Sequence, residues 1–347
     1  MSVDTGFYFA PLLFAVQIVL ALGQNVSNLP SHHWGYKSVI DEIPPTDWQK
    51  DFPSCKGKYQ SPMAIETSRT TENPSLTQLE FALYGIHPQN DTWVVINNGH
   101  AVQFSGVFGS KLPTVQAGGL PASYVFTQFH FHWGSTDSRG SEHSVDGKRY
   151  PLELHIVHRK VTEDDLEALT ESTGMAVIAI LFELTDDKDL AHQHLDAVVQ
   201  AIQLTTEPNI PKSVRIPSLS LAEFLPSSPA FYRYQGSLTT PPCAEAVEWS
   251  IMRQPQKVTE AQLNVFRRLH ERNIGNLTIP EDRLVDNFRP LQKPNGRVVS
   301  YYSGQTATPN ANFATESPII LKSQAPKFAQ VRIPAVFALV FLSVIKL

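Results

Sequence analysis

Two histidines, His130 and His132, are separated by one residue in residues 128–133, where polar and aromatic side chains alternate. Alternate side chains of a β-strand point to the same face. The two imidazoles and the amide of Gln128 therefore share one face, and the aromatic rings point to the other. Two imidazoles placed in this way can bind one metal ion, and zinc binds neutral imidazole readily.

A third ligand is needed, because a catalytic zinc site uses three protein ligands and leaves a fourth position to water. In residues 153–157 the same alternation places His155 on one strand face with Glu153. A metal-bound histidine usually donates its other N–H group to an acceptor that fixes the ring. We therefore expect Gln128 to serve His130 and Glu153 to serve His155.

Other readings of these residues fit less well. A cupin-like barrel also uses a His-x-His pair, but it expects a glutamate a few residues later, where this chain has residues 134–138 without one. A metallo-β-lactamase-like hydrolase expects an aspartate soon after the second histidine, and Trp133 and Gly134 do not supply it. Without the third histidine, the pair could equally be polar residues on a sheet.

The elements that must position these side chains are mainly strands. We expect strands at residues 93–96, 124–133, 152–158, 176–184 and 246–251, and helices at residues 162–170, 191–204 and 259–272. The last helix opens with Thr259 followed three residues later by Gln262, a capping-box pattern. No linker or repeat interrupts residues 31–302, which indicates one sheet-dominated α+β domain.

Composition narrows the function classes. Hydrophobic residues make up 42% of the chain, so it can bury a sizeable core. The formal net charge of −5 gives no basic footprint for nucleic acid, which we exclude as a partner.

The N-terminus carries the pattern of a secretory signal. Residues 7–22 are almost wholly apolar, and Ala21 and Gly23 are small residues at the spacing of a cleavage site, so residues 1–23 are predicted to be a signal peptide. Asp4 stands where a basic residue is usual, and the alternative is an uncleaved membrane anchor.

The C-terminus is also apolar. Residues 333–345 form a stretch of about 13 residues, short of the 20 or so that span a bilayer. Ser323 lies before it with a short polar spacer, which is the layout of a GPI-attachment signal. We expect lipid attachment at Ser323, removal of residues 324–347 and a flexible stalk at residues 303–323. The alternative is a short transmembrane tail.

Secretion would decide the chemistry of several other residues. Cys55 and Cys243 are the only cysteines; they would be free thiols in the cytosol, but in a secreted chain such a pair suggests one disulfide. The triplets that begin at Asn25, Asn90 and Asn276 would be N-glycosylation acceptors.

Eight segments, in order along the chain, resemble the signature segments of the α-carbonic anhydrases. They are residues 31–36, 60–62, 97–100, 128–135, 141–143, 153–158, 236–242 and 286–290. The resemblance covers residues 31–302. It implies a central, mostly antiparallel twisted sheet of about ten strands, with a few peripheral helices and zinc at the floor of a conical cleft.

The resemblance also implies the reaction, which is reversible hydration of carbon dioxide to bicarbonate and a proton by zinc-bound hydroxide. Carbonic anhydrase is itself the reference case for zinc lowering the pKa of bound water to about 7. Thr239 would accept the hydrogen bond of the hydroxide and donate its own to Glu142. The backbone carbonyl of Asn287 would hold His132. His100 matches the proton shuttle, a role that suits a histidine titrating near neutrality.

The substrate and the location follow from the same resemblance. An apolar wall would hold carbon dioxide, with Thr240 on the polar side of the cleft; its residues are Val157, Val177, Leu238, Val247 and Trp249. The positions of Cys55 and Cys243 resemble those of the extracellular, disulfide-bearing branch. We therefore expect an enzyme on the extracellular face of the plasma membrane, anchored by lipid in the outer leaflet, with bicarbonate or proton transporters within reach.

A non-catalytic binding module with the same fold is the rival function. Members of that kind typically lack one or more of the zinc-binding histidines, and His130, His132 and His155 are all present here. Three positions depart from the residues common in the family, namely Gln103, Gln235 and Phe288, and none of them removes a ligand.

Overall fold

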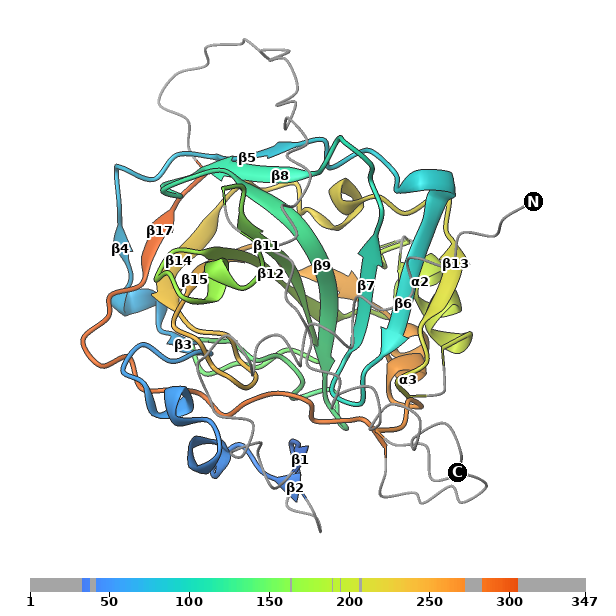
Figure 1. Ribbon diagram of the computed structural model, residues 1–347, viewed down its shortest axis with the longest axis horizontal. Coiled ribbons are helices and arrows are strands. Elements are labelled where there is room, and N and C mark those ends of the chain that lie inside the picture. Colours follow the sequence, from blue (N-terminus) through green and yellow to red (C-terminus); the bar gives the residue numbers. More distant parts are fainter. Residues whose placement is uncertain are drawn as a thin grey trace, which may run out of the picture. The chain divides into compact units, whose positions relative to one another are not determined.

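The computed structural model of the chain describes residues 33–37 and 42–304, except residues 163, 189, 194, 206–207 and 272–282 (Figure 1). Several predicted features therefore lie outside the described residues: the signal peptide, the lipid-anchor segment with Ser323, the stalk except its first two residues, and the glycosylation positions Asn25 and Asn276. Asn90 is described, and its exposed side chain lies in the short 3-10 turn η5 (Gln89–Asp91). Among the described residues, no helix combines the length and the apolar character needed to cross a bilayer.

One sheet of 13 strands dominates the described part of the chain (Figure 1). Its main path has the order β13-β6-β7-β9-β11-β12-β15-β14-β17-β4, with β5, β8 and β16 joined beside it. The strands are β4 (Thr71–Glu72), β5 (Leu79–Ala82), β6 (Thr92–Asn97), β7 (Val102–Gly106), β8 (Thr114–Ala117), β9 (Tyr124–Trp133), β11 (Leu152–Lys160), β12 (Met175–Leu184), β13 (Lys212–Arg215), β14 (Phe231–Gly236), β15 (Val247–Met252), β16 (Gln256–Val258) and β17 (Ser300–Tyr302).

Most neighbouring strands of this sheet are antiparallel, and the parallel pairs are β12–β15, β12–β16 and β17–β4. The expected sheet-dominated and mostly antiparallel architecture is therefore confirmed. Two small parallel pairs lie outside the sheet, β1 (His33–Trp34) with β2 (Glu42–Ile43) and β3 (Ala64–Ile65) with β10 (Ser144–Val145). All five strands expected from the sequence are present, and β9 has the predicted bounds.

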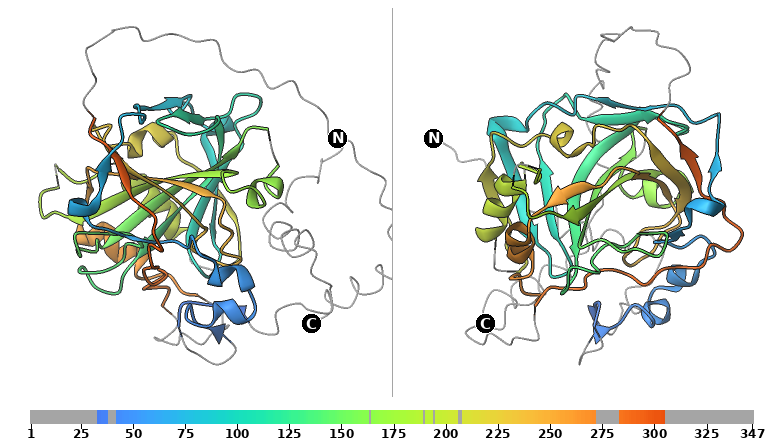
Figure 2. Two further views of the ribbon diagram at one scale, coloured as in Figure 1. Left: turned by 90° about the vertical axis from the view of Figure 1, so that its left-hand side faces the viewer. Right: turned by 180° about the vertical axis from the view of Figure 1, so that it is seen from behind.

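The helices are shorter than expected. α2 (Leu195–Gln203) and α3 (Glu260–Phe266) pack side by side (Figures 1 and 2), where Gln262 Nε2 donates to Asp196 Oδ1 over 2.7 Å. The capping box of Thr259 and Gln262 is present. Beyond Phe266 the backbone tightens into i→i+3 bonds, which ends α3 before the predicted residues 267–272.

The helix predicted at residues 162–170 is wrong, because the described residues form only the 3-10 turn η6 (Glu167–Leu169). The side chain of Asp164 accepts hydrogen bonds from the backbone N–H groups of Leu166 and Glu167. The hydroxyl of Thr170 donates to the carbonyl of Glu167. Asp164 therefore caps a short turn, and the i→i+3 bond from the N–H of Thr170 to the same carbonyl closes it before a regular helix forms.

The two faces of β9 explain how the sheet is held and where polar groups gather. Phe129, Phe131 and Trp133 are fully buried in the larger hydrophobic cluster, together with residues of α2 and α3. Burying one such side chain contributes about 1.5–3 kcal/mol. His130 and His132 alternate with these rings and therefore point to the opposite face, as the sequence predicts.

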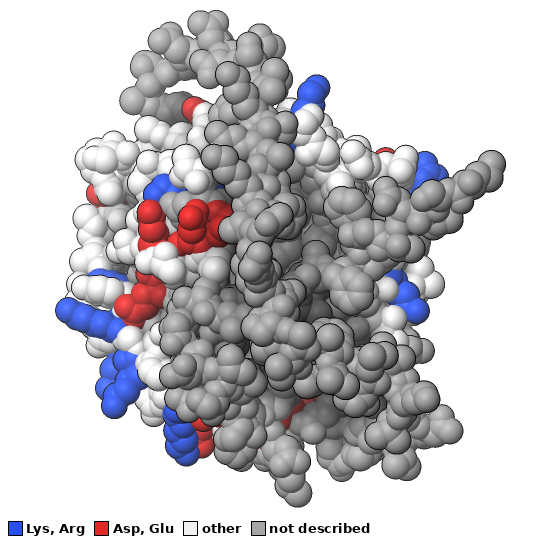
Figure 3. All heavy atoms as spheres, viewed as in Figure 1, with Lys and Arg blue, Asp and Glu red and all other residues white. Residues whose placement is uncertain are grey.

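Charge of both signs lies on the described part of the face seen in Figure 3. Asp and Glu side chains gather mainly in one group on the left of this view, whereas Lys and Arg side chains are spread over its left, upper and right margins.

Candidate active site

The three histidines meet because β9 and β11 are antiparallel neighbours in a fixed register. His155 lies opposite His130, and Glu153 lies opposite His132. Paired side chains of adjacent strands lie on the same face of the sheet. One nitrogen from each of His130, His132 and His155 lies within 4.8 Å of the others. His132 Nε2 and His155 Nδ1 are 3.1 Å apart.

Each imidazole is oriented by a hydrogen bond from the ring nitrogen that does not face the other two histidines. His130 Nδ1 donates to Gln128 Oε1 over 2.9 Å, and His155 Nε2 donates to Glu153 Oε1 over 2.7 Å. These are the partners expected from strand alternation. His132 Nδ1 donates to the backbone carbonyl of Asn287 over 2.7 Å. The three bonds leave His130 Nε2, His132 Nε2 and His155 Nδ1 to face a common centre.

Burial keeps the imidazoles of His130 and His155 in the form that binds metal. Burial, followed by the proximity of His132 and His155, holds the pKa of His130 well below its usual value. Burial, and then His132, lowers the pKa of His155 in the same way. Neutral imidazole is the ligand form, so little free energy is needed to remove a proton when a metal binds.

Glu153 accepts hydrogen bonds from two histidines and so holds His155 in place. Burial alone would raise the pKa of Glu153, but the charge and hydrogen bonds of His143 and the hydrogen bond of His155 outweigh burial and hold the pKa well below its usual range. His143 Nδ1 donates to Glu153 Oε1 over 2.6 Å, and its other ring nitrogen bonds the hydroxyl of Tyr234 over 2.7 Å. His143, Glu153 and His155 are a second group close enough to hold a metal, but their atoms already bond one another.

Glu142 lies next to the histidines and is fully buried. Its Oε1 atom accepts a hydrogen bond of 2.9 Å from the backbone N–H of Arg289. Its Oε2 atom lies 3.6 Å from His132 Nε2 and has no hydrogen-bond partner among the described residues. Thr239 is also buried, but within the described chain no hydrogen bond joins it to Glu142. The expected hydrogen bond from the Thr239 hydroxyl to Glu142 stays a prediction.

The residues expected to form the apolar wall come together beside the histidines. Val157, Val177, Val247 and Trp249 belong to one buried cluster, and Leu238 packs against it. In register, Val177 lies between Val157 of β11 and Trp249 of β15. The Trp249 ring lies 4.8 Å from the His155 ring. An uncharged, apolar surface therefore adjoins the metal-binding group.

His100 lies at the turn between β6 and β7, the strand whose Gln103 is paired with His130. Its ring stacks on Trp34, with ring centres 3.6 Å apart, and lies 5.3 Å from the ring of His33. The side chain of Asn287 donates to the backbone carbonyl of His100 over 3.0 Å. One residue thus contacts both a histidine of the metal group and the segment of the expected proton shuttle.

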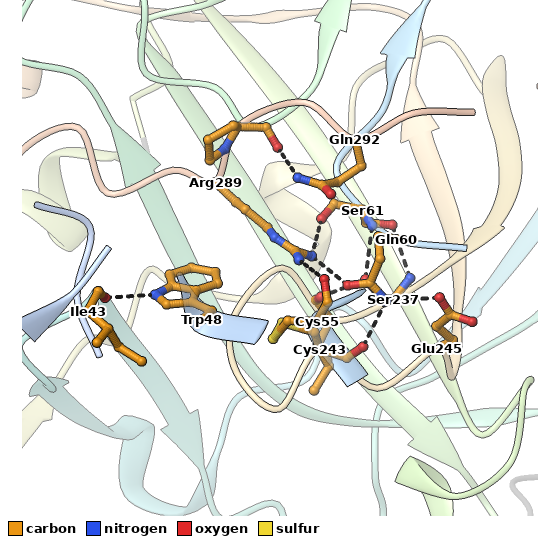
Figure 4. Close-up of a disulfide and its surroundings, with 12 residues drawn as sticks. Ile43, Trp48, Cys55, Gln60, Ser61, Ser237, Cys243, Glu245, Arg289 and Gln292 are labelled. Carbon is orange, nitrogen blue, oxygen red and sulfur yellow. Dashed lines mark hydrogen bonds between the residues drawn. A yellow bond between two sulfur atoms is a disulfide. The ribbon is translucent and has the colours of Figure 1, made fainter. Parts of the chain in front are cut away.

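A disulfide joins Cys55 and Cys243, with their Cα atoms 4.9 Å apart (Figure 4). The backbone N–H of Cys243 donates to the carbonyl of Thr240 over 2.8 Å. Half-buried Thr240 follows Thr239, so the bond ties the loop of both threonines to the N-terminal part of the domain. A surface hollow of about 400 Å³ beside it is lined by Pro242 and other residues, but not by the three histidines. The expected conical cleft stays a prediction.

Sequence reasoning missed the residues that hold this framework together. Arg289, Gln60, Ser61 and Ser237 are buried polar residues with several hydrogen bonds each. They lie in segments that carry the family resemblance, which was the available signal. Their partners are far away in the sequence, so no local pattern could assign them.

Comparisons with known proteins show the family to which the chain belongs. The profile of the eukaryotic-type carbonic anhydrase family matches residues 44–303. The chain is 34% identical over 278 residues to carbonic anhydrase 7 of Mus musculus, covering 78% of this chain and 98% of the mouse protein. It is 35% identical over 274 residues to carbonic anhydrase 7 of Homo sapiens, covering 77% of this chain and 96% of the human protein. The chain therefore belongs to the eukaryotic-type carbonic anhydrases, a family of enzymes.

Proposed function

We propose that this protein binds zinc through His130, His132 and His155 and catalyses the reversible hydration of carbon dioxide to bicarbonate and a proton. One observation carries the proposal. Three imidazoles converge, half-buried His130 and buried His132 and His155, each held by a hydrogen bond to a separate acceptor, with one nitrogen of each ring left for a shared ion.

The donor set fits zinc. Three neutral nitrogen ligands are the set used in catalytic zinc sites that keep one position open. When bound, zinc lowers the pKa of its water so that hydroxide is available near neutral pH. The groups that accept the N–H bonds of the three rings, namely Gln128, the carbonyl of Asn287 and Glu153, would raise the basicity of the ligating nitrogens and fix the tautomers.

The residues of the chain supply the rest of the chemistry. The apolar side chains around Val177 and Trp249 suit a small uncharged substrate, because they offer it contact without competing polar groups. The Thr239 hydroxyl would orient the attacking oxygen and donate its own proton to Glu142, whose Oε2 atom has no other partner among the described residues. His100 would carry the released proton from the site to solvent, a role suited to an imidazole.

Purified protein tests this function directly. Carbon dioxide hydration should be fast with one equivalent of zinc, be lost with a chelator and return with added zinc. Thr239→Ala should keep zinc but slow hydration by about 100-fold or more, since a well-placed hydrogen bond at the reacting centre is lost. Zinc-loaded protein with no hydration activity would favour the non-catalytic binding module.

We also propose that the enzyme acts at the extracellular face of the plasma membrane, anchored through lipid at Ser323. The apolar ends of the sequence and the Cys55–Cys243 bond support this location, because disulfides persist in oxidising compartments. Carbon dioxide and bicarbonate outside the cell, the outer leaflet and nearby bicarbonate or proton transporters would then be its partners. Phosphatidylinositol-specific phospholipase C should release active enzyme from intact cells. A mature peptide containing residues 337–347 would contradict the lipid anchor.

A further inference from the structure

Arg289 is a charged residue with only 2% of its surface exposed, and its side chain takes no part in the proposed reaction. Its guanidinium group reaches the segment next to the disulfide (Figure 4). Nη2 donates to the carbonyl of Cys55 over 3.0 Å. Nη1 donates to Gln60 Oε1 over 2.8 Å and to the carbonyl of Ser61 over 2.9 Å. A planar group with fixed donors matches such a set of acceptors better than a lysine could.

These acceptors are themselves firmly held. Cys55 is bonded covalently to Cys243. Gln60 Nε2 donates to the carbonyl of Cys243 over 3.2 Å and to Glu245 Oε1 over 2.9 Å. The backbone N–H of Ser61 donates to Ser237 Oγ over 2.9 Å. The guanidinium therefore binds a segment that is itself bonded to Ser237 and Cys243, the residues on either side of Thr239 in the same loop.

The backbone of Arg289 also holds the carboxylate of Glu142. The N–H group of Arg289 donates to Glu142 Oε1 over 2.9 Å, and both residues are buried. With that oxygen occupied, Oε2 is the one that faces the metal group, 3.6 Å from His132 Nε2. Burial lowers the pKa of Arg289 to about 10, and the charge of Glu142 opposes this effect, so the two charges also support each other.

We propose that Arg289 is a positioning residue for Glu142: its guanidinium, anchored on Cys55, Gln60 and Ser61, fixes the backbone N–H that turns the carboxylate toward the metal group. This inference rests on the proposed function, where Glu142 receives the hydrogen bond of Thr239. Without the guanidinium, the N–H group would lose its fixed place and the carboxylate could rotate.

The zinc ligands should be spared, because Asn287 is anchored independently. Its side-chain oxygen accepts from the N–H of Trp133 over 2.7 Å, and its side-chain nitrogen donates to the carbonyls of Phe131 and His100. The acceptor of His132 therefore does not depend on the Arg289 side chain. A positioning role predicts slow hydration at full zinc content.

The test compares Arg289→Ala and the milder Arg289→Lys with wild type and with Arg233→Ala. Arg233 is a matched control, since it is 6% exposed and its ion pair with Glu248, at 3.7 Å, lies on the other face of the sheet from Tyr234. Two quantities are measured on zinc-loaded protein. One is kcat/KM for carbon dioxide hydration, and the other is hydrogen exchange of the amide at residue 289, followed by NMR.

Arg289→Ala should bind one zinc, lose kcat/KM by about 10-fold or more, and exchange the amide at residue 289 faster. Free guanidine should restore part of the rate, and Arg289→Lys should be intermediate. Arg233→Ala should lower the melting temperature without either effect. If Arg289→Ala or, where that variant does not fold, Arg289→Lys keeps both kcat/KM and amide protection, the positioning role is wrong. An equal loss of kcat/KM in Arg233→Ala would also overturn it. If zinc-loaded wild type is inactive, the proposed function fails, and amide exchange alone decides whether Arg289 holds this N–H group.

Discussion

Asn287→Ala should lower both the stability of the metal-free domain and its affinity for zinc. The side chain of Asn287 is fully buried and makes three hydrogen bonds, while its backbone carbonyl holds His132. Alanine keeps the carbonyl and removes all three side-chain bonds. The segment that positions His132 would then be free to shift.

The expected magnitudes follow from these bonds. The backbone N–H of fully buried Trp133 would lose its partner, and an unsatisfied buried donor costs about 1–3 kcal/mol. We therefore expect the free energy of unfolding of the metal-free protein to fall by about that amount. Loss of an outer partner of a metal ligand typically weakens metal binding by about 10–100-fold.

Urea unfolding of the metal-free protein and zinc titration against a competing chelator measure the two effects. Asn264→Ala is the control, because the same change there removes one bond of 3.3 Å from Arg267 within helix α3, where alanine is well tolerated, and should alter stability by no more than about 0.5 kcal/mol. If Asn287→Ala matched this control in stability and bound zinc as tightly as wild type, the side chain of Asn287 would not hold the site.

Three further predictions concern other parts of the domain. Burial lowers the pKa of His158 to about 4, from the 6.5 of a histidine in an unfolded chain. As the pH falls, the unfolded chain therefore protonates at this histidine before the folded protein does. The free energy of unfolding should therefore fall by up to about 3 kcal/mol between pH 6.5 and 4, and urea unfolding of His158→Gln should lack this component. His100→Ala should lower kcat in weak buffer, keep kcat/KM and be rescued by imidazole; a joint fall of both constants without rescue would make His100 a packing residue. Replacing Cys55 and Cys243 by serine should lower the free energy of unfolding by at most about 5 kcal/mol, since their separation of 188 residues closes a long loop; an unchanged urea midpoint would show that the bond does not stabilise the domain.

The metal group could be predicted from the sequence because its geometry is local. A period of two residues places Gln128 with His130, and Glu153 with His155, on the same face of their own strands, and the structure pairs them as hydrogen-bond partners. The wall residues and Asn287 came from the resemblance instead, since no local pattern links residues of different strands.

The missed features depend on tertiary contacts. Arg289 reaches Cys55 across 234 residues of sequence, and the side chain of Asn287 reaches Phe131 across 156. Neither contact leaves a periodic trace in the chain. The helix predicted at residues 162–170 was wrong for a local reason. The side chain of Asp164 caps a helical turn inside the predicted range, and the turn closes at Thr170, whose N–H group and hydroxyl both bond the carbonyl of Glu167.

The most direct test of the central claim is anomalous diffraction at the zinc edge from crystals of the zinc-loaded protein. The hydrogen bonds of the three rings specify the ligating atoms as His130 Nε2, His132 Nε2 and His155 Nδ1. One zinc ion at about 2.0–2.1 Å from each of these atoms is the predicted result. A zinc ion held by His143 and Glu153 instead, or no bound zinc under saturating conditions, would contradict the account.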